Sequence, residues 1–298
     1  MIAVSEYELL CEAAGLVDRS ARAKFIVRGS EGADFLQGQV SNDVEALVPG
    51  TGCYATVLNH KGKLRTDLRI LRGEGFFWLD TEAIGHAVVR HLLETYSLGR
   101  DVQFEDVTEE RAILSLLGPA ARERLDAAPP EEEHSWVEGG HGMYVATDLG
   151  VDVICDPGTE LGVEPVSEEA AECLRIEAGR PRLGYDMDAD TIPQEAGINE
   201  RAVSFTKGCY VGQETVARLF YKGKPNRQLR GLQLAEPAKR GAEILLGEKP
   251  VGRLGSTCVS PTLGPIALAL VRREAPPGTR VLVGGAEAEV VELPFERA

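Results

Sequence analysis

In the first part of the chain, segments with helical spacing of hydrophobic residues are followed by short apolar runs. Residues 5–17 ("SEYELLCEAAGLV") place leucines and alanines on one helical face, and residues 24–29 ("KFIVRG") predict a short strand. Ser30 is the predicted N-cap of a helix over residues 31–40. Residues 54–71 ("YATVLNHKGKLRTDLRIL") predict two strands joined by a hairpin turn at residues 59–62.

The middle of the chain continues this mixture of helices and antiparallel strands. Ser167 predicts the N-cap of a helix that ends at Gly179. The regular strand-helix-strand rhythm of a dinucleotide fold is missing, so the pattern predicts the α+β class. The remaining predicted elements are strands at 76–81 and 112–118, helices at 81–96 and 120–128, and a second hairpin at 143–155.

The pattern changes at about residue 224. From there the chain consists of short strand-like segments separated by Gly and Pro turns, such as "RQLRGLQL", "PIALALV" and "TRVLVGG". Such a series predicts a small barrel of strands only. We therefore expect two parts, an α+β region over residues 1–223 and a C-terminal β-barrel over residues 224–298.

Composition narrows the class of partners. The formal net charge of -15 argues against a protein that binds nucleic acid or an anionic membrane through a basic face. The longest apolar run, residues 266–271, is too short to span a bilayer, and the acidic start is unlike a secretory signal. A cytoplasmic location is expected. The acidic stretch over residues 129–136 is interpreted as a solvated loop.

Cysteine and histidine spacing predicts no metal site. The six cysteines form no CxxC pair, and five of them lie in apolar or helical settings typical of small core residues. The five histidines are dispersed, so we assign them no chemistry. Cys209 is the exception among the cysteines.

Cys209 lies in the segment "FTKGCYVGQETVAR" over residues 205–218. A neighbouring cation such as Lys207 lowers the pKa of a thiol and makes the reactive thiolate more abundant, and the flanking glycines let a ligand approach. The alternative is a buried thiol in a glycine-shaped turn. Gln213 and Glu214 could orient a ligand, and Arg218 could pair with an anion. Surface hydrogen bonding explains these three residues equally well.

Asp67 lies on the second strand of the first predicted hairpin. Strand alternation places it on the same face as Arg65 and Arg69. A carboxylate on that face points to solvent or lines a cavity, and the pattern alone favours solvent.

Several motifs together resemble the glycine cleavage T-protein superfamily. They are "FLQGQVSNDVEALVPG", "LRIEAGRPRLGYDM", "VGRLGSTCVSPTLGPIALALV" and the terminal "VVELPF". Within that superfamily, "KGCYVGQE" over residues 207–214 is similar to the YgfZ-type folate-binding branch, which is associated with iron–sulfur cluster proteins. The resemblance implies three subdomains around a central folate site and tetrahydrofolate as cofactor.

The resemblance also implies roles for individual residues. Asp67 matches the catalytic aspartate of the T-protein, which holds and polarises the folate amine that takes up the one-carbon unit. Tyr54 matches a tyrosine of the folate site, and Asp152 falls where the T-protein has a glutamate that binds the pterin. Two positions depart from the pattern: Thr66 replaces the first of a pair of aspartates, and Ala171 replaces an arginine.

Three functions remain open at this point. The leading hypothesis is a YgfZ-type tetrahydrofolate-binding protein that supports assembly or repair of iron–sulfur enzymes. In that case Cys209, Lys207 and Asp67 carry the chemistry, and Tyr54, Asp152, Gln213, Glu214 and Arg218 help to hold the folate. The alternative is a folate-dependent aminomethyltransferase or demethylase. A third possibility is a folate-free scaffold that acts through Cys209 on a partner protein.

Overall fold

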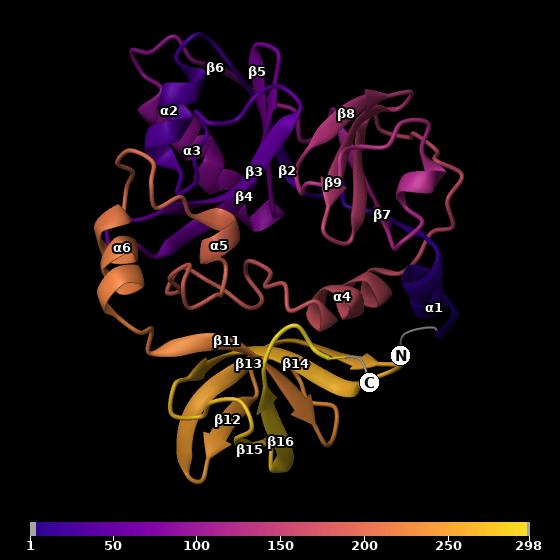
Figure 1. Cartoon of the computed structure of the whole chain (residues 1–298), viewed down its shortest axis with the longest axis vertical. Coiled ribbons are helices and arrows are strands. Elements are labelled where there is room, and N and C mark those ends of the chain that lie inside the picture. Colours follow the sequence, from indigo (N-terminus) through magenta and orange to yellow (C-terminus); the bar gives the residue numbers. More distant parts are fainter. Residues whose placement is uncertain (1–3, 297–298) are drawn as a thin grey trace.

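The computed structural model describes residues 4–296 and shows three lobes, two built on sheets and one a barrel (Figure 1). The first lobe is a five-stranded antiparallel sheet of order β3-β4-β5-β2-β6, covered by helices α2 and α3. Phe25, Phe35, Leu68 and Leu93 belong to its buried core. Its elements are β2 (Ala23–Arg28), α2 (Gly32–Gln39), β3 (Thr51–Leu58), β4 (Leu64–Gly73), β5 (Phe76–Thr81), the 3-10 turn η1 (Ala83–Gly85), α3 (His86–Tyr96) and β6 (Gln103–Asp106).

The second lobe is another five-stranded sheet, of order β1-β7-β10-β9-β8. Its central strand β10 pairs antiparallel with β7 on one side and β9 on the other, and Asp152 lies opposite Ser115 in that register. Helix α1 lies beside this lobe and contacts helix α4. The elements are α1 (Val4–Glu12), β1 (Gly15–Asp18), β7 (Ala112–Leu117), the 3-10 turn η2 (Arg122–Arg124), β8 (Trp136–Gly139), β9 (Gly142–Thr147) and β10 (Gly150–Cys155).

A central segment connects these lobes to the barrel. It carries helices α4 (Glu168–Glu177), α5 (Asn199–Ala202) and α6 (Gln213–Lys222). The Ser167 hydroxyl accepts a hydrogen bond from the Ala170 amide at 3.3 Å, so the predicted N-cap of α4 is present. Gly179 has a φ of 69°, the left-handed conformation that suits a residue just beyond a helix end.

The third lobe is a closed six-stranded barrel of order β11-β14-β13-β12-β15-β16. Its interior is filled by aliphatic side chains such as Leu232, Ile244 and Val290. The α+β fold with a C-terminal barrel predicted from the sequence is therefore confirmed. The division at residue 224 stays a prediction. The barrel strands are β11 (Arg227–Leu234), β12 (Glu243–Leu246), β13 (Lys249–Ser260), β14 (Gly264–Arg272), β15 (Arg280–Val283) and β16 (Ala286–Val291).

Three local predictions are wrong. Ser30 does not cap α2, because its amide and hydroxyl both donate to Asp101, and the helix starts after Glu31 without a side-chain cap. The helix predicted over residues 120–128 is only the single turn η2. The first helix ends at Glu12, because the following residues 15–18 form strand β1 against β7.

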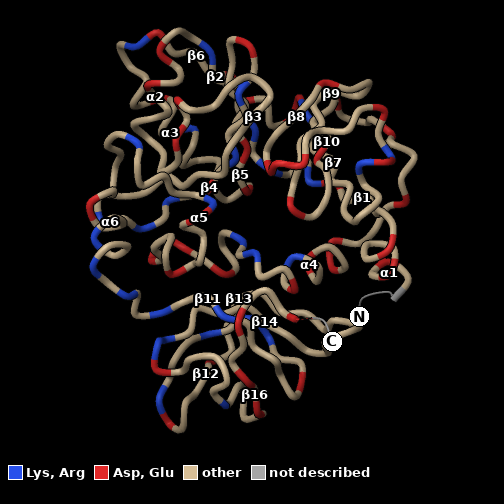
Figure 2. The backbone as a smooth tube through the Cα atoms, in the orientation of Figure 1, with Lys and Arg blue, Asp and Glu red and all other residues tan. Residues whose placement is uncertain are grey.

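Charges are unevenly placed along the fold. Acidic residues are spread over all three lobes, whereas Lys and Arg are frequent along α6 and the segment that leads to β11 (Figure 2). No helix between residues 4 and 296 is long and apolar enough to cross a membrane.

Candidate functional site

A cavity of about 160 Å³ lies between the two five-stranded sheets, and we call it the two-sheet cavity. Tyr54 of β3 and Arg69 of β4 line it from one sheet, and Ser115 of β7 and Asp152 of β10 from the other. Two larger cavities, of about 560 and 610 Å³, border the barrel, and none of the predicted site residues lines either of them.

Half-buried Tyr54, which lines this cavity, forms a hydrogen-bonded pair with buried Asp67. The Tyr54 hydroxyl donates to Asp67 Oδ2 at 2.6 Å, and the Arg201 guanidinium lies 5.2 Å from the centre of the Tyr54 ring. Burial raises the pKa of Asp67, and burial together with the nearby carboxylate raises the pKa of Tyr54 well above 10.0. The strand pattern alone favoured a solvent-facing Asp67. In the structure its side chain is buried instead, because both faces of β4 are covered.

Thr66 lies next to Asp67 but belongs to a different environment. Its side chain is fully buried and hydrogen-bonded to the Thr81 hydroxyl at 3.0 Å. Neighbouring residues on a strand point to opposite faces, so Thr66 points away from the face that carries Asp67.

Asp152 is held by hydrogen bonds to two other residues that line the cavity. One of its oxygens accepts from Arg69 Nη1 at 2.6 Å and the other accepts from the Ser115 hydroxyl at 2.6 Å. Arg69 also donates to the fully buried carboxylate of Asp80 at 2.8 Å, and Arg22 binds the same carboxylate at 2.8 Å. Burial alone would raise the pKa of Asp80, but the charges of Arg69 and Arg22 outweigh it and lower the pKa to about 2.

Several buried polar atoms at the two-sheet cavity lack a hydrogen-bond partner within the described chain. Folded proteins rarely leave such atoms unpaired, so their concentration at one cavity indicates a polar ligand. They can donate and accept, which suits a heteroaromatic ring with both amine and carbonyl groups. They belong to the lining residues Arg19, Arg69, His134 and Thr147, and to Asp67 beside Tyr54.

His134 is a site residue that the sequence reasoning missed. It lies in the acidic stretch predicted to be a solvated loop, yet its ring lines the cavity. Neither ring nitrogen has a hydrogen-bond partner among the described residues, and Nε2 lies 3.5 Å from Glu133 Oε1. The solvated-loop prediction is therefore wrong at its end, where Glu133 also pairs with Arg201. Burial lowers the pKa of His134 to about 4, so the ring is neutral at pH 7 and has one donor and one acceptor to offer.

Cys209 is exposed and does not line the two-sheet cavity. Lys207, two residues earlier, is buried, and its amine donates to the carbonyls of Gln37, Val40 and Asn42 at 2.5, 2.8 and 2.9 Å. Burial lowers the pKa of Lys207 to about 8, so the amine still carries its proton at pH 7. Lys207 therefore ties the motif loop to the end of α2. Its expected effect on the reactivity of the Cys209 thiol stays a prediction.

Replacing Lys207 by methionine is expected to destabilise the fold by about 3 kcal/mol, because three carbonyls lose a charged donor. Urea unfolding followed by circular dichroism measures this difference. The matched control is Lys222→Met at the exposed end of α6, which should change stability by less than about 0.5 kcal/mol. Equal stability of the two variants would contradict the anchoring role.

The other residues of the motif begin helix α6. Gly212 has a φ of 86°, and a Cβ there would lie 2.5 Å from the Asn59 carbonyl oxygen. The motif thus packs directly on the hairpin turn between β3 and β4, the strands that carry Tyr54 and Asp67. Gln213 is half-buried, whereas Glu214 and Arg218 are exposed on α6 and do not line the two-sheet cavity. Their ligand-binding roles stay predictions.

Comparisons with family models and with known proteins lead to the same family. Residues 2–150 match the model of the GCVT N-terminal domain, and residues 227–295 match that of the glycine cleavage T-protein C-terminal barrel domain. An aminomethyltransferase of Rubrobacter xylanophilus is 30% identical over 321 residues, which cover 98% of this chain and 86% of that protein. The chain belongs to the glycine cleavage T-protein family.

Other members of this family agree with the assignment. An aminomethyltransferase of Bacillus subtilis is 28% identical and covers 97% of this chain and 90% of its own length. The solved structure of the glycine cleavage system aminomethyltransferase T from Bartonella henselae has a TM-score of 0.88 at 26% identity, over 98% of this chain and 89% of that one. The predicted superfamily is confirmed, and the cofactor prediction agrees with aminomethyltransferases of this family, which use tetrahydrofolate.

Proposed function

We propose that this chain binds tetrahydrofolate in the two-sheet cavity and transfers a one-carbon unit to it, as an aminomethyltransferase of the T-protein type. The observation that carries the proposal is the group of unpaired buried polar atoms around Tyr54 and Asp67. The names of the relatives favour this function over the YgfZ-type role that we placed first.

The residues present fit the pterin part of the cofactor. Thr147 and the neutral ring of His134 can each donate and accept, Arg19 and Arg69 each have one unpaired donor atom, and Asp67 Oδ1 is an unpaired acceptor. When bound, tetrahydrofolate supplies the amine nitrogens that take up the one-carbon unit.

Asp67 is the residue that acts on protons in this proposal. Tyr54 occupies Oδ2, which leaves Oδ1 to accept a hydrogen bond from an amine or to take its proton. The Arg201 guanidinium lies over the face of the Tyr54 ring, and an ion pair with Glu133 positions Arg201 in turn. Asp152 takes part indirectly, because its bond to Arg69 orients the guanidinium whose Nη2 is unpaired.

The test is a one-carbon transfer assay. The chain is incubated with tetrahydrofolate and a protein that carries an aminomethyl group, and methylenetetrahydrofolate is measured. We expect turnover by the wild type and by Asp156→Asn, a matched change at an exposed carboxylate. If the chain binds tetrahydrofolate saturably but forms no methylenetetrahydrofolate, the proposed transferase activity is wrong.

A second candidate function rests on the exposure of Cys209 in the "KGCYVGQE" motif. In this candidate the chain is a folate-binding protein of the YgfZ type that supports iron–sulfur enzymes from a cytoplasmic location. Cys209→Ser is then expected to abolish support of an iron–sulfur enzyme in cells while tetrahydrofolate binding is retained. Full support by Cys209→Ser would rule this candidate out.

A further inference from the structure

Two cysteines that are far apart in sequence meet between the central segment and the barrel. Cys173 lies on α4 and Cys258 on β13, and their sulfur atoms are 3.1 Å apart. All six cysteines of the chain are free thiols in this structure. We interpreted both residues as separate small core side chains, and the fold instead brings them together as a pair.

Polar contacts on either side hold the two cysteines in place. The Arg175 guanidinium of α4 donates to the Ser256 hydroxyl of β13 at 2.6 Å, and the Ser260 hydroxyl of β13 donates to Glu177 of α4 at 2.6 Å. Cys258 lies midway between Ser256 and Ser260, and Cys173 precedes Arg175 by two residues. The pairing of the sulfur atoms is therefore fixed by the way in which α4 packs on the barrel.

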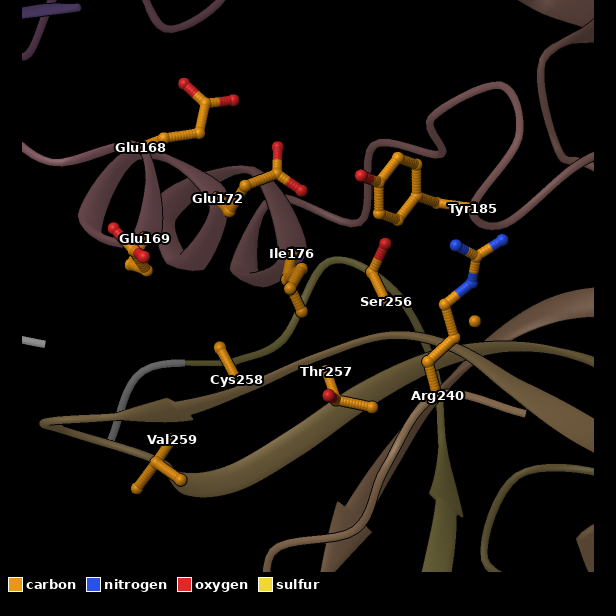
Figure 3. A pocket seen from close by; sticks show the side chains of 11 residues that line it. Glu168, Glu169, Glu172, Ile176, Tyr185, Arg240, Ser256, Thr257, Cys258 and Val259 are labelled. Carbon is orange, nitrogen blue, oxygen red and sulfur yellow. The ribbon is translucent and has the colours of Figure 1, made fainter. Parts of the chain in front are cut away.

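The pair is reachable from one side. Cys258 is half-buried and lines the cavity of about 560 Å³ that α4 forms with the barrel, below Ile176 (Figure 3). Cys173 is fully buried behind it. A reagent that enters this cavity reaches Cys258 first.

A carboxylate lies behind the buried thiol. The Cys173 thiol donates to Glu177 Oε1 at 3.6 Å, and the Cys258 thiol donates to the Cys173 sulfur. Glu177 can thus accept the proton of Cys173 when that sulfur becomes a nucleophile.

We propose that Cys173 and Cys258 form a dithiol site that closes to a disulfide by exchange with a small-molecule disulfide such as oxidised glutathione. The Cys258 thiolate attacks one sulfur of the small disulfide and releases the first thiolate. Cys173 passes its proton to Glu177, attacks the Cys258 sulfur of the mixed disulfide, and releases the second thiolate. Two protein thiols are oxidised, one small disulfide is reduced, and the two protein protons end on the two released thiols.

The closed form would link α4 covalently to the barrel across 85 residues of sequence. The sulfur atoms lie about 1 Å beyond the length of a disulfide bond. The same geometry suits a trivalent arsenical, which two adjacent thiols bind as a chelate.

The experiment uses the full chain with Cys209→Ser, so that the exposed thiol does not compete. After incubation with oxidised glutathione and alkylation of the remaining thiols, peptides are analysed by mass spectrometry without reduction. We expect a Cys173–Cys258 cross-linked peptide, with Cys53 and Cys155 recovered as alkylated thiols in treated and untreated samples. Phenylarsine oxide is expected to protect both Cys173 and Cys258 from alkylation.

Single substitutions show whether the two thiols act as a unit. In the additional variant Cys173→Ser, Cys258 should retain a glutathione adduct, and phenylarsine oxide should no longer protect it. The proposal is overturned if no cross-linked peptide forms under conditions in which Cys209 of the wild type carries glutathione.

Discussion

Replacing Asp67 by asparagine is expected to lower the rate of one-carbon transfer by about 10²–10⁴-fold, the usual contribution of a positioned acid or base. The amide keeps the shape of the side chain and an oxygen for the Tyr54 hydroxyl, but it cannot take a proton. Tetrahydrofolate affinity should fall much less than the rate. Single-turnover formation of methylenetetrahydrofolate, measured beside calorimetric binding, separates the two effects.

The pH profile of the wild type provides a check on the same residue. Because burial raises the pKa of Asp67, the rate should fall on acidification at a pH above the ordinary 3.8 of an aspartate. Tyr54→Phe, which removes the hydroxyl but keeps the ring under Arg201, should cost about tenfold. An Asp67→Asn variant with nearly wild-type turnover would show that this carboxylate is not the catalytic group.

Replacing Asp80 by alanine is expected to destabilise the fold by about 3–5 kcal/mol. Its fully buried carboxylate binds Arg69 and Arg22 and accepts from the Trp78 indole at 3.0 Å. Without it, Asp152 and Glu82 are the ionic partners that remain for Arg69 and Arg22, respectively, among residues 4–296. Denaturant unfolding at pH 7 measures the loss.

The matched control for Asp80 is Asp190→Ala. Asp190 pairs with Lys63 at 2.7 Å but has a 79% exposed side chain, so its removal should change the free energy of unfolding far less than removal of Asp80. The pKa of Asp80 lies below its unfolded value, at about 2 against 3.8, so its stabilisation is present above pH 3.8 and lost as pH falls towards 2. The stability difference between wild type and Asp80→Ala should therefore shrink in that window, and a constant difference would contradict the assigned charge network.

The sequence predicted most strands because turn residues bracket them. The hairpin between β3 and β4 turns at residues 59–62 as expected, and the barrel strands follow the Gly and Pro punctuation. The failures have local physical causes. Ser30 is bound by Asp101, a residue 71 positions away, and Arg122 donates to the Pro130 carbonyl at 3.0 Å where a longer helix was predicted.

The site was only partly visible in the sequence. Tyr54 and Asp67 lie on the two strands of one hairpin, so a local motif could point to both. His134 and Arg19 reach the two-sheet cavity from segments outside the helices and strands, and no spacing in the chain indicates that they converge. The same holds for Cys173 and Cys258, which meet only because α4 packs on β13. Contacts between lobes are set by tertiary packing, which the local pattern does not encode.

Titration of tetrahydrofolate into the purified chain tests the central claim most directly. We predict saturable binding to the wild type, strong weakening in His134→Ala, which removes two unpaired nitrogens from the cavity wall, and no change in Lys249→Ala on the barrel surface. No detectable binding to the wild type at millimolar ligand, or equal binding by His134→Ala, would contradict the placement of the folate in the two-sheet cavity.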